Sequence, residues 1–128
     1  MTTDELHELA EQIGVTVTTH DEGPKGWYSH HLRTISLHTS LRAANYRCTL
    51  AHEIAHAIAG DTHTGLAHFD ARAERAANMT AAQMLITQHD YEQAERIHGP
   101  HLGAIARELG VTKELLDVWK QTYERQKQ

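Results

Sequence analysis

The sequence lacks the features that mark exported or membrane-bound proteins. It has one cysteine, Cys48, so no internal disulfide can form, and a reducing cytoplasm is the expected setting. No apolar run approaches the roughly 20 residues that a membrane-spanning helix needs. The N-terminal stretch MTTDELHELAEQ is polar and acidic, unlike a signal peptide. We therefore expect a cytoplasmic protein without a membrane anchor.

A basic surface is also missing from the composition. The net charge is −5 with histidine neutral, whereas general affinity for nucleic acid needs excess positive charge to displace counterions. This argues against direct nucleic-acid binding. The length of 128 residues suits one domain and is too short for two well-formed ones. What the chain has in unusual number is histidine, with twelve residues.

The hydrophobic pattern predicts short strands between helices. A helix is expected near residues 3–13. Strands are expected at residues 15–20 and in the stretches WYSHH and RTISLH, with the turn DEGPKG after the first. Helical patterns follow at residues 41–59, 70–88, 91–98, 102–109 and from residue 112 onward. The prediction is a single α+β domain over residues 1–128, in which a small antiparallel sheet of about three strands packs on a mainly helical body.

The most informative stretch is LAHEIAHAIAG, at residues 50–60, which holds an H-E-x-x-H pattern. His52 and His56 are four residues apart, so on a helix they share one face and reach one metal ion. Glu53 is rotated by roughly 100° from His52 and is better placed to contact a metal-bound water than to be a ligand. The pattern is typical of zinc hydrolases, in which the two histidines bind the ion and the glutamate is the general base.

The alternative for this stretch is an ordinary buried helix. Leu50, Ile54, Ala57 and Ile58 make it apolar nearly all round. Placing two histidines and a glutamate in such a helix is costly unless they have partners, which favours the metal site.

A catalytic zinc site normally has three protein ligands and one open position, so a third ligand is needed. His63 falls one residue late for the pattern H-E-x-x-H-x-x-G-x-x-H, and His68 lies in a loop without a motif. Cys48 lies one turn before the first histidine but ~12 Å along the helix axis from the second, too far for both to bind one ion. We expect it to be a small core residue.

Glu74, in the following helical stretch ARAERAANMTAAQMLI, is the remaining candidate for the third ligand. A carboxylate from an antiparallel helix completes a His₂Glu set, and the small residues Ala77 and Ala81 allow the two helices to approach closely. Asn78 lies one turn after Glu74 and is placed to orient a ligand. The alternative for Glu74 is a solvated charge between two arginines.

The stretches TLAHEIAHAIAG and ERAANMTAAQMLI resemble the IrrE/ImmA-type metallopeptidases of bacteria, phages and other mobile elements. In that family the H-E-x-x-H helix is followed by E-x-x-A-N/D-x-F-A-A-x-L-L-x-P. The residues that fit this second motif in order are Glu74, Ala77, Asn78, Ala81, Ala82, Met84 and Leu85. The sequence departs at Thr80 and Thr87, where the family usually has Phe and Pro; the match covers residues 26–87. The resemblance implies a zincin-like domain with one Zn²⁺ per chain, in which His52, His56 and Glu74 are ligands and Glu53 is the catalytic base.

The resemblance also implies a partner. Such peptidases are similar to regulatory enzymes that cut or inactivate a repressor, usually a helix-turn-helix DNA-binding protein encoded nearby. The expected substrate is therefore a repressor of a phage, mobile element or stress response, located in the bacterial cytoplasm. The resemblance is also compatible with a phage-encoded protein. The alternative is a non-catalytic regulator, either an antirepressor or a DNA-binding module on the same scaffold.

The C-terminal segment, residues 90–124, contains a helix-turn-helix-like spacing in LGAIARELGVTKELLDVW. Thr112 is expected to cap the last helix after a turn at Gly110. Five basic and four acidic residues between positions 107 and 127 offer little affinity for phosphate. This balance favours the alternative, in which the two helices complete the core or dock a substrate. For the oxyanion of the reaction, Tyr28, His30, His63 and His68 are candidates, and no spacing selects one.

Overall fold

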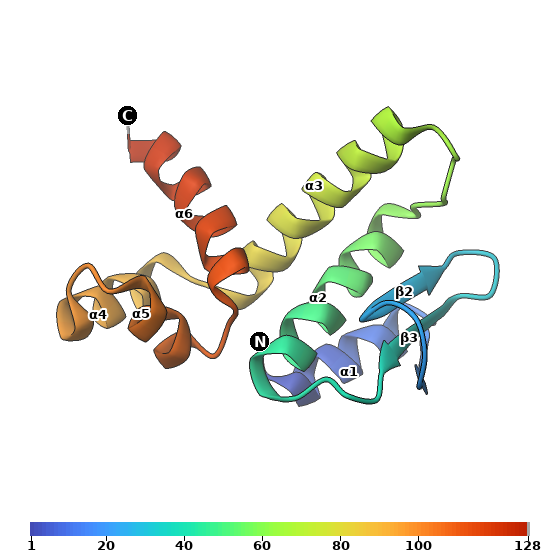
Figure 1. The fold of residues 1–128 in the computed structure, drawn as a ribbon, viewed down its shortest axis with the longest axis horizontal. Helices are drawn as coiled ribbons and strands as arrows, with labels where there is room; N and C mark the ends of the chain where they lie inside the picture. Colours follow the sequence, from blue (N-terminus) through green and yellow to red (C-terminus); the bar gives the residue numbers. More distant parts are fainter. Residues whose placement is uncertain (128) are drawn as a thin grey trace.

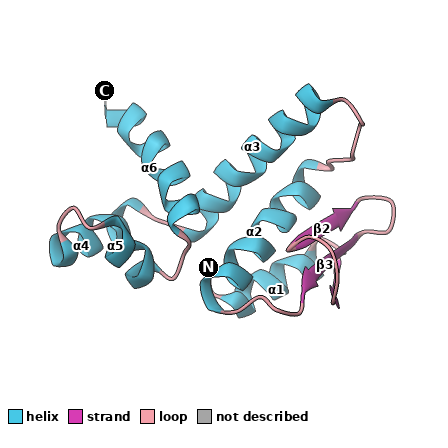
Figure 2. Ribbon diagram, in the orientation of Figure 1, coloured by secondary structure: helices cyan, strands magenta, loops and turns pink. Residues whose placement is uncertain are grey.

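The computed structural model describes residues 1–127 and begins with a helix, α1 (Thr3–Gln12). Three strands follow: β1 (Thr16–His20), β2 (Gly26–Ser29) and β3 (Thr34–His38). The rest is helical: α2 (Ala43–Ala59), α3 (Ala67–Leu85), α4 (Gln88–His98), α5 (Leu102–Leu109) and α6 (Lys113–Lys127) (Figures 1 and 2). The predicted α+β fold, with more helix than strand, is confirmed.

The sheet is mixed, so the predicted antiparallel sheet is wrong in this respect. Its strand order is β1-β3-β2. β1 pairs with β3 in parallel, whereas β2 pairs with β3 antiparallel. A short turn such as DEGPKG often joins paired antiparallel strands, but β1 and β2 do not pair with each other here. Instead β3 takes the centre, because its residues Ile35, Ser36 and Leu37 are buried while β1 and β2 keep exposed positions.

The helix ends follow local capping. α2 ends at Gly60, whose left-handed conformation (φ 70°) makes it the predicted C-terminal stop. α3 begins and ends a few residues earlier than the predicted 70–88. It ends earlier because Thr87 accepts a hydrogen bond from the Asp90 amide and so caps a separate helix, α4. Before α3, Asp70 accepts hydrogen bonds from the amide and hydroxyl of Thr64, which ties the α2–α3 loop to the first turn of α3.

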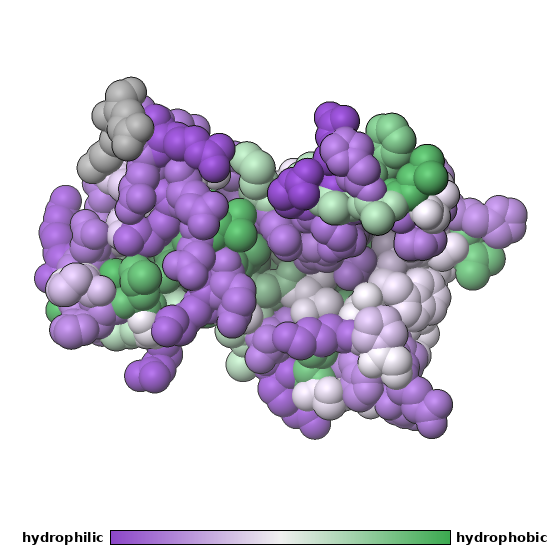
Figure 3. All heavy atoms as spheres, turned by 45° about the horizontal axis from the view of Figure 1, so that its top comes forward, coloured by the Kyte–Doolittle hydropathy of each residue, from purple (hydrophilic) through white to green (hydrophobic). Residues whose placement is uncertain are grey.

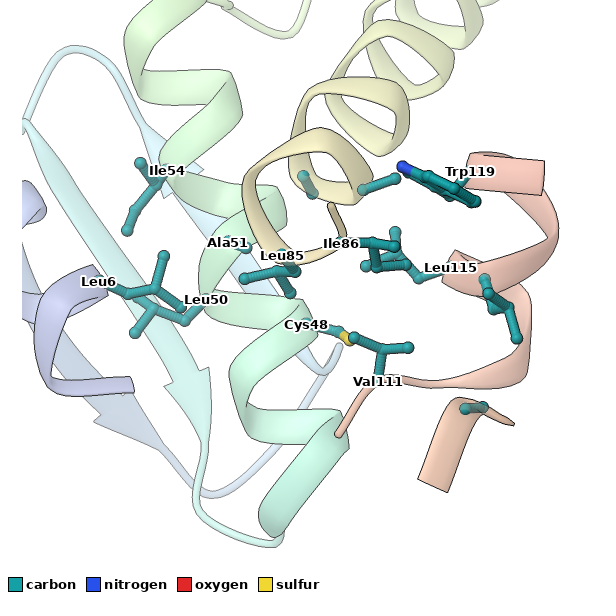
Figure 4. Close-up of a cluster of buried hydrophobic side chains, with 14 of the residues drawn as sticks. Leu6, Cys48, Leu50, Ala51, Ile54, Leu85, Ile86, Val111, Leu115 and Trp119 are labelled. Atoms are coloured by element: carbon teal, nitrogen blue, oxygen red, sulfur yellow. The ribbon is translucent and has the colours of Figure 1, made fainter. Parts of the chain in front are cut away.

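α2 is the central helix of the core and is covered on two sides (Figure 4). Leu6, Leu50 and Ile54 lie on the side of α2 that faces α1 and the sheet, as Figure 4 shows. On the other side of α2 lie the end of α3 and, beyond it, the beginning of α6, with the side chains of Leu85, Ile86, Val111, Leu115 and Trp119. Ile58 is exposed, so the apolar surface of α2 is less complete than the sequence suggests. The core therefore fixes the position of the helix that carries the H-E-x-x-H motif.

The C-terminal helices complete this core. Thr112 caps α6 as predicted, with its hydroxyl oxygen accepting from the Leu115 amide at 3.2 Å. The guanidinium group of Arg47, on α2, donates to the carbonyl oxygens of Leu109 and Gly110 at 3.0 Å each, which holds the α5–α6 turn against α2. Cys48 is buried beside it and accepts from the Thr112 amide at 3.5 Å, so the prediction of a core residue is confirmed.

The molecular surface is hollowed between the part that carries the C-terminal helices and the rest. Figure 3 shows mostly hydrophilic residues over both parts and hydrophobic ones in the hollow. Within residues 1–127, none of the helices combines the length and apolar character that crossing a membrane requires.

Candidate metal centre

Three of the predicted site residues meet where α2 and α3 run side by side (Figure 1). The carboxylate of Glu74 lies between the two histidines: its Oε2 is 2.9 Å from His52 Nε2 and its Oε1 is 2.9 Å from His56 Nε2. The two Nε2 atoms are 3.1 Å apart. One ligand atom from each residue thus converges on one point, and among the described residues this is the group able to hold a metal ion.

The spacing of these atoms fits a small divalent cation. Four ligands at roughly 2.0–2.1 Å from a tetrahedral ion lie roughly 3.3 Å from one another. The separations of 2.9 and 3.1 Å are close to that value. Two imidazoles and one carboxylate are also a donor set that zinc accepts in catalytic sites. The residues present therefore fit a bound metal.

The small side chains between the helices make this convergence possible. Ala77 and Ala81 of α3 are buried, as predicted, and their small volume lets α3 approach α2 closely. Glu74 lies on the same face of α3, one turn before Asn78. Its side chain is 59% exposed, so it reaches the histidines from the open side of the site.

The other histidines and the cysteine do not join this group. His63 is 86% exposed and lies 3.3 Å from Asp70, and His68 packs against the ring of Phe69. Cys48 belongs to the core. The predicted choice of Glu74 over these alternatives agrees with the geometry.

Glu53 is buried beside the group, with 6% of its surface exposed. Burial raises the pKa of its carboxyl to about 7; the positive charge of His56 opposes this rise and the negative charge of Glu74 adds to it. Glu53 is not part of the three-residue group, and its role as a base stays a prediction. A carboxyl with a pKa near neutrality is suited to taking and releasing a proton.

Each histidine has a further partner that orients its ring. Asn78, the residue predicted to orient a ligand, interacts with the His52 side chain. Burial lowers the pKa of His52, and the nearby charge of Glu74 and the bond to Asn78 act against this. His56 is bound by Asp61, whose Oδ2 is 2.9 Å from Nδ1. Histidine ligands in metal sites typically have such partners on the ring nitrogen that does not face the ion.

Asp61 was not predicted from the sequence. The signal that points to it is Gly60: a left-handed glycine at a helix end turns the chain back onto the last turn. Here the Asp61 amide donates to the His56 carbonyl at 3.0 Å, which returns the side chain to the His56 ring.

The site opens into a cleft with a volume of about 1040 Å³. One wall is β2 with Gly26, Trp27 and Tyr28, and the other is the first turn of α6, where Thr112 and Leu115 lie. The side chains of Glu53 and the three converging residues line the same cleft. The C-terminal segment therefore contributes to the surroundings of the site.

The Tyr28 hydroxyl and His30 are engaged with each other. The hydroxyl forms a hydrogen bond with His30 Nδ1 at 2.8 Å and accepts one from the Arg33 guanidinium at 3.0 Å. Among the four predicted oxyanion candidates, the geometry of the described residues thus selects none.

Gly26 is the point of closest approach between β2 and α2. A Cβ at this position would lie 2.7 Å from Thr49 Cγ2 and 3.2 Å from Glu53 Oε2. We expect Gly26→Ala to displace β2 from α2 and to destabilise the protein by about 1–3 kcal/mol, because overpacking forces backbone shifts. Denaturant unfolding measures the change, with Gly103→Ala as the control, since a Cβ there meets nothing within 4 Å. Equal stability of Gly26→Ala and wild type would show that the contact is easily relieved.

The fold and the His–His–Glu group together define a metallopeptidase-like domain. A family model described as the IrrE N-terminal-like domain, Peptidase_M78, matches residues 10–118. Because this match covers most of the chain, the protein belongs to that family. The match extends beyond residues 26–87, and includes the sheet and the first half of α6. A comparison with curated proteins found no match.

Proposed function

We propose that the protein is a zinc-dependent endopeptidase that hydrolyses a peptide bond in a specific regulatory protein. The observation that carries this proposal is the convergence of His52, His56 and Glu74 next to the buried Glu53, in an open cleft. Membership of a peptidase family supports it.

His52, His56 and Glu74 would hold the ion, and Glu53 would move the proton. Zinc bound there supplies a Lewis acid that polarises the scissile carbonyl and lowers the pKa of water. The Glu53 carboxylate takes a proton from the attacking water and passes it to the leaving amine. Its low exposure keeps bulk water from competing for that proton. In this role Glu74 is ionised and both imidazoles are neutral, each with its free lone pair directed to the ion.

The cleft suits an extended substrate chain. β2 is an edge strand, since β3 pairs with it on one side only. A peptide laid along this edge pairs with the β2 backbone and passes the metal-ligating residues, which line the same cleft. A folded loop without an extended segment cannot pair with the edge in this way, which favours a flexible region of the substrate.

The proposed substrate is a helix-turn-helix repressor encoded near this protein. Its support is the family resemblance and one physical property of the chain. The net charge of −5 is complementary to a DNA-binding protein, whose surface must be basic to bind phosphate. The negative charge of this protein accelerates association with a basic partner, and the same charge repels nucleic acid.

The direct test combines the zinc-loaded protein with the helix-turn-helix protein encoded nearest to its gene. We expect two new fragments by intact-mass spectrometry, and none after zinc is removed with a chelator. Restored cleavage on returning zinc excludes an effect of the chelator on the substrate. Stable binding that relieves repression without any cleavage would contradict the proposal and favour the non-catalytic antirepressor.

A further inference from the structure

We propose that Asp61 is a positioning residue for the metal centre, which fixes the imidazole of His56 with Nε2 facing the ion. This inference rests on the proposed metal site. It assigns a role to a residue that lies outside both sequence motifs, at the beginning of the α2–α3 loop.

The hydrogen bond between these two residues favours a proton on Nδ1 of His56. Asp61 Oδ2 lies 2.9 Å from Nδ1. A carboxylate only accepts hydrogen bonds, so Nδ1–H is the donor. Nε2 faces a carboxylate as well, at 2.9 Å from Glu74 Oε1, but it belongs to the group able to hold a metal ion. With an ion bound between these residues, the Nε2 lone pair is directed to the ion and the proton stays on Nδ1, where Asp61 accepts it. With the other tautomer, the proton would face the ion and the ligand would be lost.

Burial leaves the His56 ring few other partners. Its side chain is 10% exposed, so water has little access to replace a missing acceptor at Nδ1. An ionised acceptor also forms a stronger hydrogen bond than a neutral one and makes the imidazole a better electron donor to the ion. His52, in contrast, has the neutral Asn78 as its partner. The two histidines are thus oriented by different partners, and the stronger hydrogen bond is the one from His56 to the Asp61 carboxylate.

The backbone holds Asp61 in this position. Gly60 has φ 70°, a conformation that favours glycine, and its amide donates to the Ala57 carbonyl at 3.1 Å. The next amide, that of Asp61, donates to the His56 carbonyl at 3.0 Å. Asp61 is therefore bound to His56 through both its backbone and its side chain.

The far end of the same loop is tied to α3. The Thr64 amide and hydroxyl donate to Asp70 Oδ1 at 3.0 and 2.8 Å. Asp70 lies one turn before Glu74 on α3. The loop that crosses between the tips of α2 and α3 in Figure 1 thus contacts a ligand-bearing turn at each end. This arrangement limits the freedom of Asp61 to leave His56.

The test compares zinc affinity in the wild type, Asp61→Ala and Asp61→Asn, with Asp117→Ala as control. Asp117 is an exposed residue of α6 outside the cleft. Competition with a chromophoric chelator measures the dissociation constant. We expect Asp61→Ala to bind zinc about 10–100-fold more weakly, as is typical for loss of a partner behind a histidine ligand. Asp61→Asn keeps an acceptor oxygen without the charge, so its zinc affinity should lie between those of the wild type and Asp61→Ala. Asp117→Ala should match the wild type.

A second readout separates orientation from general stability. In ¹⁵N spectra of the zinc-loaded protein, we expect a slowly exchanging Nδ1–H signal from His56 in the wild type and Asp61→Asn, and its loss in Asp61→Ala. The thermal unfolding midpoints of the metal-free proteins should differ by no more than ordinary surface substitutions cause.

The outcomes are distinguishable. Wild-type zinc affinity and an unchanged Nδ1–H signal in Asp61→Ala would overturn the role of Asp61 and leave the proposed function intact. Equal weakening in Asp61→Asn and Asp61→Ala, with metal-free stability reduced in both, would show a structural role and also overturn it. A wild type that takes up no zinc would overturn the proposed function and this inference together.

Discussion

The variant Glu53→Gln is expected to bind one zinc ion per chain with near wild-type affinity and to lose about 10²–10⁴-fold in peptide hydrolysis, the usual contribution of a general base. Glutamine keeps the size of the side chain but cannot take a proton from water. The metal is retained because Glu53 is not one of the three converging residues. The rate of substrate cleavage and elemental analysis of the same preparation measure the two effects.

The matched control for this variant is Glu8→Gln, the same chemical change at an exposed residue of α1 outside the cleft. It should retain the wild-type cleavage rate. Cleavage at the native rate by Glu53→Gln would show that another group moves the proton. Full biological activity of Glu53→Gln without cleavage would instead identify a non-catalytic regulator.

The Glu53→Gln substitution should also stabilise the metal-free protein at pH 8. The pKa of Glu53 rises from 4.5 to about 7 on folding, so the folded state holds a proton that the unfolded chain has released. Below pH 4.5 the Glu53 carboxyl is protonated in both the folded and the unfolded state, so its ionisation does not reduce the stability of the fold. Between 4.5 and 7 stability falls with rising pH, and above 7 the loss reaches about 3 kcal/mol, at 1.36 kcal/mol per unit. Chelated Glu53→Gln should therefore exceed the wild type in denaturant unfolding at pH 8 and match it at pH 4.

The variant Glu74→Ala is expected to lose stoichiometric zinc. It removes the one charged ligand and leaves two neutral imidazoles, so the affinity should fall further than the 10–100-fold typical of an outer partner. The fold should persist, because the Glu74 side chain is 59% exposed and contributes little buried surface. Elemental mass spectrometry on folded protein gives the metal content per chain. Glu8→Ala, an exposed residue of α1, is the control.

The two possible failures of this prediction have different meanings. Zinc retained at full affinity in Glu74→Ala would place the third ligand elsewhere, and His63, close to the same cleft, would be tested next. A wild type that holds no metal even after reconstitution would make α2 a structural helix, and the C-terminal helices would become the candidates for function.

Local features of the chain predicted most of its elements. The stop at Gly60, the cap at Thr112 and the pattern of α2 each depend on residues within about one or two turns, so they can be found without the fold. The pairing of β1 with β3 cannot be found in this way. It depends on which strand is most deeply buried between the others, and therefore on the whole core.

The same distinction between local pattern and tertiary packing holds for the residues of the metal centre. The sequence by itself determined that His52 and His56 share a face, because helical geometry places residues four apart one above the other. Only the tertiary structure decided that Glu74 reaches them, since this depends on how closely α3 packs against α2. It also decided the place of Asp61, since the path of the loop returns this residue to His56. A helix carries its own periodicity, whereas contacts between helices depend on side-chain volumes and on the connection between them.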